Sequence, residues 1–146
     1  MIAYFDTSLL IGRYIPQDNG TRFAIEAAEQ CETIIVSDFT ILEAKNALRA
    51  ACFRKEISSE ELDMALEALQ DDVSNGALNL IQLDANVVFQ VTDQIAHSII
   101  PAQEGRTLDL LHLGYAVMLE VEHFATADKR QASCAESQGL NVLLIS

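Results

Sequence analysis

Short apolar runs alternate with longer segments of helical periodicity along the whole chain. The runs at residues 2–5, 33–36, 78–83, 124–127 and 142–145 are apolar or β-branched and predict buried strands. Between them, apolar side chains recur at spacings of three and four, which predicts helices. We expect helices at about residues 9–14, 23–28, 38–53, 59–74, 85–99, 108–121 and 129–137.

Capping residues and helix breakers mark the ends of these helices. Ser37 or Asp38 can cap the third helix, and Asp84 can cap the fifth. Ser58 and Glu61 have the spacing of a capping box ahead of the fourth helix. Breaks are expected where glycine and proline fall between the periodic segments, at Pro16, Gly20, Gly76, Pro101, Gly105 and Gly139.

The alternation of short strands with helices predicts an α/β fold. Its core would be a central parallel sheet of about five strands with helices on both faces. The length of 146 residues and the lack of any linker composition favour one domain over residues 1–146. In such a sheet, ligands bind beyond the carboxyl ends of the strands, where the strand order reverses.

Four acidic residues are expected at this carboxyl edge. Asp6 and Asp128 each follow a predicted strand, and Asp109 lies in the first turn of the helix that leads into the fourth strand. Glu43 lies within the first two turns of the helix that leaves the second strand. All four would face one crevice if the first and fourth strands are neighbours.

Clustered carboxylates repel one another unless a proton or a cation neutralises them. Two unit charges 4 Å apart repel by about 4 kcal/mol at an effective dielectric constant near 20. Ligand sets made only of oxygen suit Mg²⁺ or Mn²⁺, so Asp6, Asp109 and Asp128 are candidate metal ligands. Such an ion supplies the chemistry that phosphodiester hydrolysis needs.

Several polar residues flank these acids. Thr7, Ser8 and Thr126 can orient ligating oxygens or bound waters. Arg106 can contact a phosphate or pair with a carboxylate.

Each acid also has an ordinary structural explanation, which stays open. An acid after a strand is often a helix N-cap, and an acid in a first turn complements the helix dipole. Taken alone, the position of Glu43 is typical of a solvated helix residue. The position of His112, on an apolar helix, is typical of a hydrogen-bonded core histidine. Only the convergence of the acids favours a chemical role.

Composition narrows the classes of function. The chain has 22 acidic and 9 basic residues and a net charge of −13, which argues against binding nucleic acid through a broad basic surface. No run approaches the roughly 20 apolar residues that a membrane span needs. The three cysteines show no metal-site or disulfide spacing, and no secretory signal pattern is found, so we expect a cytoplasmic protein with free thiols.

The acidic residues lie in recognisable motifs, which are YFDTSLL from Tyr4, SDFTILE from Ser37, RTLDLLHL from Arg106, FATAD from Phe124 and GLNV from Gly139. In their order and spacing the chain resembles the PIN-domain family, and especially the VapC-like toxin nucleases of type II toxin–antitoxin modules. The resemblance extends over almost the whole chain. Two positions depart from the family pattern, because Gly114 stands where alanine is common and Asp38 adds a charge.

The resemblance implies a PIN-like domain and a Mg²⁺- or Mn²⁺-dependent endoribonuclease. The catalytic acids of the family correspond to Asp6, Glu43, Asp109 and Asp128, and its supporting residues correspond to Thr7, Ser8, Arg106 and Thr126. It also implies a homodimer that cleaves RNA and is inhibited by a small antitoxin, whose basic C-terminal segment lies across the active site. The helix pair around residues 38–75 would form part of the antitoxin groove.

Two other classes of function are alternatives to the nuclease. A catalytically silent PIN-like module that binds protein or RNA would need none of the four acids. An aspartyl-phosphate enzyme would need a second acid close to Asp6, but Ser8 stands where a haloacid-dehalogenase-type site has one. Both alternatives are therefore weaker than the nuclease.

Overall fold

The computed structural model describes residues 1–15, 19–99 and 105–144 and has a five-stranded parallel sheet at its centre. The strands lie in the order β3-β2-β1-β4-β5. Their bounds are β1 Ile2–Phe5, β2 Thr33–Ser37, β3 Leu78–Ile81, β4 His123–Thr126 and β5 Asn141–Leu144. The order reverses at β1, whose two neighbours are β2 and β4, so the adjacency that the site requires is present.

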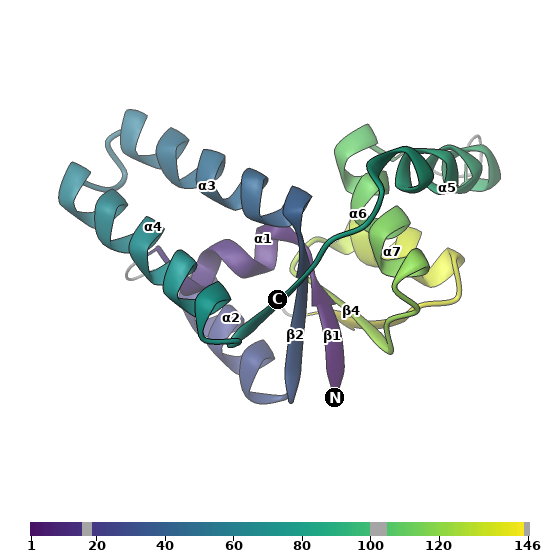
Figure 1. Cartoon of the computed structure of the whole chain (residues 1–146), viewed down its shortest axis with the longest axis horizontal. Coiled ribbons are helices and arrows are strands. Elements are labelled where there is room, and N and C mark those ends of the chain that lie inside the picture. Colours follow the sequence, from purple (N-terminus) through teal and green to yellow (C-terminus); the bar gives the residue numbers. More distant parts are fainter. Residues whose placement is uncertain (16–18, 100–104, 145–146) are drawn as a thin grey trace.

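The helices cover both faces of this sheet, as Figure 1 shows. One face carries α1 (Thr7–Leu10), the 3₁₀ helix η1 (Ile11–Arg13), α2 (Asn19–Glu29), α3 (Asp38–Phe53) and α4 (Ser59–Ser74). The other face carries α5 (Ala85–Ile99), α6 (Thr107–Met118) and α7 (Lys129–Ser137). The α/β architecture expected from the sequence is confirmed.

Strand alternation divides the apolar residues between two cores. Ala3 and Phe5 on β1 pack with Leu9, Leu48 and their neighbours on the side of α1 to α4. Tyr4, between them, packs on the opposite side against α5, α6 and α7. Successive side chains of a strand point to opposite faces, so the central strand is apolar throughout.

Capping explains where the helices begin. Ser37 and Thr40 form a reciprocal capping box at the start of α3, and Ser58 and Glu61 form another at the start of α4. Asp84 accepts a hydrogen bond from the Asn86 backbone N–H ahead of α5. These caps satisfy backbone N–H groups that have no partner within the helix.

Some boundaries differ from those expected. Gly20 lies inside α2 and does not break a helix, and β3 ends at Ile81, two residues early. The helix expected to run to residue 121 ends at Met118, because Glu120 adopts a left-handed conformation with φ 51°. The expected positions Pro16, Pro101 and Ile145 lie outside the described residues.

The end of α6 is a Schellman motif. The N–H of Glu120 donates to the Val117 carbonyl, and the N–H of Val121 donates to the Ala116 carbonyl. A glutamate at the left-handed position gives no sequence signal, whereas Gly139, which follows α7 at a φ of 79°, does.

The remaining features of the fold are simple. All three cysteines are free. Within the described ranges, no helix is both long and apolar enough to cross a membrane.

Helices α5 and α6 approach closely at Gly114. A Cβ atom on this residue would lie 2.1 Å from the Thr92 Oγ1 atom and 3.4 Å from the Val88 carbonyl oxygen. The Thr92 hydroxyl is itself fixed, because it donates a 2.7 Å hydrogen bond to the Val88 carbonyl. The glycine that departs from the family pattern therefore makes room for Thr92.

We predict that Gly114→Ala destabilises the fold by about 1–3 kcal/mol, the usual cost of overpacking a core. Adding Thr92→Ala should recover much of this loss, because it removes the atom that collides. Denaturant unfolding of both single variants and the double variant measures the coupling. A double variant no more stable than Gly114→Ala would contradict the packing described.

Candidate functional site

The carboxyl edge of the sheet brings the four predicted acids together from four elements. Asp6 follows β1 and Asp128 follows β4, and these strands are hydrogen-bonded neighbours. Asp109 lies in the first turn of α6, and Glu43 lies on α3. In Figure 1 this edge is where α1 and α3 leave the ends of β1 and β2.

Asp6 is buried, with 4% of its surface exposed, and it accepts three hydrogen bonds. Its Oδ1 atom accepts from the Leu9 backbone N–H at 3.1 Å and from the Ser8 hydroxyl at 2.8 Å. Its Oδ2 atom accepts from the Thr126 hydroxyl at 2.5 Å. Burial nevertheless raises the pKa of Asp6 above its usual value, against the opposing effect of these donors and of His112.

Glu43 is held on one side of its carboxylate. Its Oε1 atom accepts from the Thr7 hydroxyl at 2.8 Å and lies 2.6 Å from the His112 Nε2 atom. Burial would raise its pKa, but His112 and Thr7 outweigh burial and hold the pKa of Glu43 below its usual value. Glu43 is therefore ionised at neutral pH.

Asp109 and Asp128 are less buried than Asp6. Asp128 caps α7, because its Oδ1 atom accepts from the backbone N–H groups of Arg130 and Gln131. Burial, and then the charges of Asp128 and Glu43, raise the pKa of Asp109 above its usual value. The electrostatic coupling shows that these three carboxylates share one region.

The predicted supporting residues have definite partners, with one difference. Thr7 binds Glu43, and Ser8 and Thr126 bind Asp6. The positive charge of Arg106 acts on Asp109, but among the described residues Arg106 forms no ion pair with a carboxylate. Its side chain instead lines a small pocket beside Asp109.

His112 has a larger place in the site than the sequence indicated. It is buried and hydrogen-bonded, as expected, but its partners include Glu43, Thr7 and the Tyr4 hydroxyl. Its spacing of three residues from Asp109 puts both on one side of α6, and this was the available signal. Tyr4, inside an apolar strand, gave no signal at all.

The side chains at this edge are of the chemical type that binds a hard divalent cation, but the described side chains are not grouped as a ready metal site. Four carboxylates, three of them electrostatically coupled, are the ligand type that Mg²⁺ and Mn²⁺ prefer. In the ranges that the structure describes, however, no three Asp, Glu, His or Cys side chains are grouped as a ready metal site.

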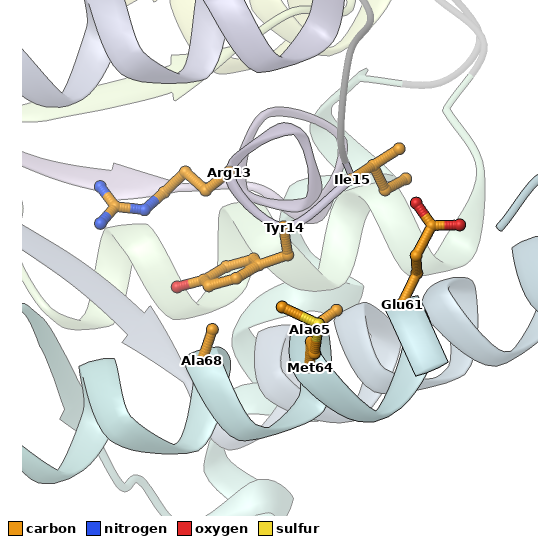
Figure 2. A pocket seen from close by; sticks show the side chains of 7 residues that line it. All are labelled: Arg13, Tyr14, Ile15, Glu61, Met64, Ala65 and Ala68. Atoms are coloured by element: carbon orange, nitrogen blue, oxygen red, sulfur yellow. The ribbon is translucent and has the colours of Figure 1, made fainter. Parts of the chain in front are cut away.

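A separate pocket of about 360 Å³ lies between η1 and α4. Figure 2 shows Tyr14 and Ile15 facing Met64, Ala65 and Ala68 across it. The Tyr14 hydroxyl donates a 2.7 Å hydrogen bond to Asp72. The pocket is mostly apolar and is distinct from the acidic edge.

Comparisons with known proteins identify the fold. No family model and no curated protein matches the chain. Among solved structures, FitAcB from Neisseria gonorrhoeae aligns with a TM-score of 0.72 at 17% identity, over 98% of this chain and 96% of that one. VapC20 from Mycobacterium tuberculosis, a sarcin-ricin loop cleaving toxin, aligns with a TM-score of 0.69 at 14% identity, over 90% and 93% of the two chains.

A third structure, VapBC-1 from nontypeable Haemophilus influenzae, aligns with a TM-score of 0.69 at 14% identity, over 99% of this chain and 98% of that one. The similarity to all three extends over nearly the full length of both chains. The chain therefore has the PIN-like fold of VapC-type toxins, as its sequence motifs implied.

We predict that Asp109→Asn stabilises the metal-free protein at neutral pH. A carboxyl group whose pKa is raised by folding contributes stability at low pH that is lost as the pH rises through the folded-state pKa. The uncharged amide does not lose stability in this way, so Asp109→Asn should have a higher melting temperature than the wild type at pH 7. This difference in melting temperature should shrink as the pH is lowered. Thermal melts in chelator across pH measure it.

Asp93→Asn is the matched control, since Asp93 is exposed in the middle of α5. Its melting temperature should follow that of the wild type across pH. A destabilised Asp109→Asn protein at pH 7 would contradict the repulsion inferred at the acidic edge.

Proposed function

We propose that this protein is a Mg²⁺- or Mn²⁺-dependent endoribonuclease that hydrolyses RNA phosphodiester bonds, and that it is the toxin of a toxin–antitoxin pair. The observation that carries the proposal is the convergence of Asp6, Glu43, Asp109 and Asp128 at one edge of the sheet. The fold that holds them is also that of VapC20, a sarcin-ricin loop cleaving toxin.

The four acids would have different roles. Asp6, Asp109 and Asp128 would hold the ion, and Ser8 and Thr126 would fix the orientation of Asp6. When bound, the ion polarises a phosphoryl oxygen, activates water and neutralises developing charge. Ionised Glu43 would accept a hydrogen bond from the attacking water and orient it, and Arg106 would contact a substrate phosphate.

The strong negative charge of the chain is compatible with an RNA substrate. At −13 the surface repels a polyanion at long range, so binding must depend on local cations. A divalent ion at the acidic edge and Arg106 beside Asp109 would supply them. Cleavage should therefore depend on the ion for binding as well as for chemistry.

We further propose a small antitoxin as partner and a homodimer as the assembled state. VapBC-1 and FitAcB are solved complexes of similar fold. The pocket between η1 and α4, which has an apolar floor and is also lined by Arg13 and Glu61, would form part of the groove for the antitoxin (Figure 2). Where the antitoxin segment continues across the acidic edge, a basic side chain in it would compete with the metal for the carboxylates.

One observation favours a second candidate, a catalytically silent PIN-like module that binds protein or RNA. Both oxygens of Asp6 already accept hydrogen bonds from within the protein. The coupled charges at Asp109 count against this candidate, since a silent protein gains nothing from retaining their repulsion.

Cleavage of total RNA tests the proposal. Purified protein freed of any bound inhibitor should give discrete fragments with Mn²⁺ or Mg²⁺ and none with EDTA. Asp6→Asn and Asp109→Asn should each lower the rate by about 100-fold or more, the loss typical of removing a group that stabilises transition-state charge. Asp93→Asn, an exposed acid on α5, should cleave like the wild type.

Two outcomes would count against the nuclease. Folded wild-type protein that cleaves no RNA under these conditions would favour the silent module. Cleavage that survives in both Asp variants would place the activity elsewhere or in a contaminant.

A further inference from the structure

His112 lies where four elements meet. It is on α6, is 3% exposed, and contacts Tyr4 on β1, Thr7 on α1 and Glu43 on α3. Its ring is also packed between aromatic side chains, with the Phe39 centroid at 4.7 Å and the Tyr4 centroid at 5.8 Å. The imidazole therefore has little freedom to turn.

The hydrogen bonds determine which nitrogen carries a proton. The Thr7 hydroxyl donates its hydrogen to the Glu43 Oε1 atom, so toward the ring it can only accept. An ionised Glu43 carboxylate also only accepts. The His112 Nε2 atom lies 2.6 Å from Glu43 Oε1 and 3.2 Å from Thr7 Oγ1, so it must carry a proton to satisfy either contact.

The other nitrogen is fixed by a buried hydroxyl chain. The His112 Nδ1 atom lies 2.9 Å from the Tyr4 hydroxyl, which lies 3.0 Å from Ser37 Oγ and 2.9 Å from Thr40 Oγ1. A phenolic hydroxyl is both donor and acceptor, so Tyr4 can donate to Nδ1. Ser37 and Thr40, which also cap α3, hold that hydroxyl in place.

We infer that His112 is a positioning residue for Glu43. Its Nε2–H group holds Glu43 Oε1, with Thr7, and leaves Oε2 as the oxygen available at the acidic edge. Of the described residues, none hydrogen-bonds Glu43 Oε2. The catalytic role of Glu43 rests on the proposed function, whereas the contact between His112 and Glu43 is a feature of the structure itself.

This role differs from that of an ordinary core histidine. A histidine with a purely structural role needs only a hydrogen-bond partner at each ring nitrogen. The positioning role specifically requires an N–H donor at Nε2. Two substitutions separate the nitrogens, because a glutamine amide reaches roughly the Nε2 position and an asparagine amide roughly the Nδ1 position. His112→Gln should keep the contact with Glu43, and His112→Asn should keep only the contact with Tyr4.

The first measurement needs no activity and no variant of uncertain folding. Long-range ¹H–¹⁵N correlation spectra of metal-free protein with ¹⁵N-labelled histidine report the protonation of each ring nitrogen. The His112 ring signals are assigned in uniformly ¹³C,¹⁵N-labelled wild-type protein through scalar correlations to the backbone, and we expect Nε2 to be protonated. A neutral ring with its only proton on Nδ1 would overturn the inference.

The second measurement separates kcat from KM for RNA cleavage. His112→Asn should lower kcat by about 10- to 100-fold, the usual loss when a partner that orients a site residue is removed. His112→Gln should restore most of it, and KM should change little in either. His97→Gln, at an exposed position on α5, is the control and should match the wild type.

The results that would overturn the positioning role of His112 differ from those that would overturn the nuclease proposal. Equal loss of kcat in both folded His112 variants, or none in either, would overturn the positioning role while the nuclease stands. If wild-type protein cleaves no RNA, the nuclease proposal fails, and the Nε2 proton still decides whether His112 holds Glu43. If both variants unfold, the wild-type spectrum decides the same question.

Discussion

The burial of Asp6 is the constraint on which this edge of the molecule depends. A carboxylate that is 4% exposed at the end of the central strand must be supplied with donors by its surroundings. Ser8 and the Leu9 N–H come from α1, and Thr126 comes from β4. Thr126 also accepts from the Asp128 N–H, so the same hydroxyl links two of the acids.

A second buried network connects this edge with both cores. Tyr4 belongs to the apolar core under α5, α6 and α7, while its hydroxyl reaches the capping box of α3, where β2 ends and α3 begins. Through His112 the network continues to Glu43 and Thr7. Buried polar networks of this kind favour a single arrangement, because each buried member is costly to leave unpaired.

The sequence predicted the fold and the position of the acids because both depend on local patterns. Strand alternation, the capping boxes and an acid after each of two strands are all visible over a few residues. The end of α6 was missed because Glu120 takes a conformation that usually signals itself through glycine. Nor could His112 be paired with Tyr4, 108 positions away, because no local pattern shows which side chains from distant elements meet.

Metal uptake at the acidic edge tests the account most directly, since the metal-ligand and nuclease roles assigned there depend on it. Electron paramagnetic resonance measures free Mn²⁺ during titration into metal-free protein, and it detects binding without any RNA. The account predicts one site per chain in the wild type and in Asp93→Asn, with much weaker uptake by Asp6→Asn. Equal uptake by Asp6→Asn and wild-type protein, or none by either, would contradict it.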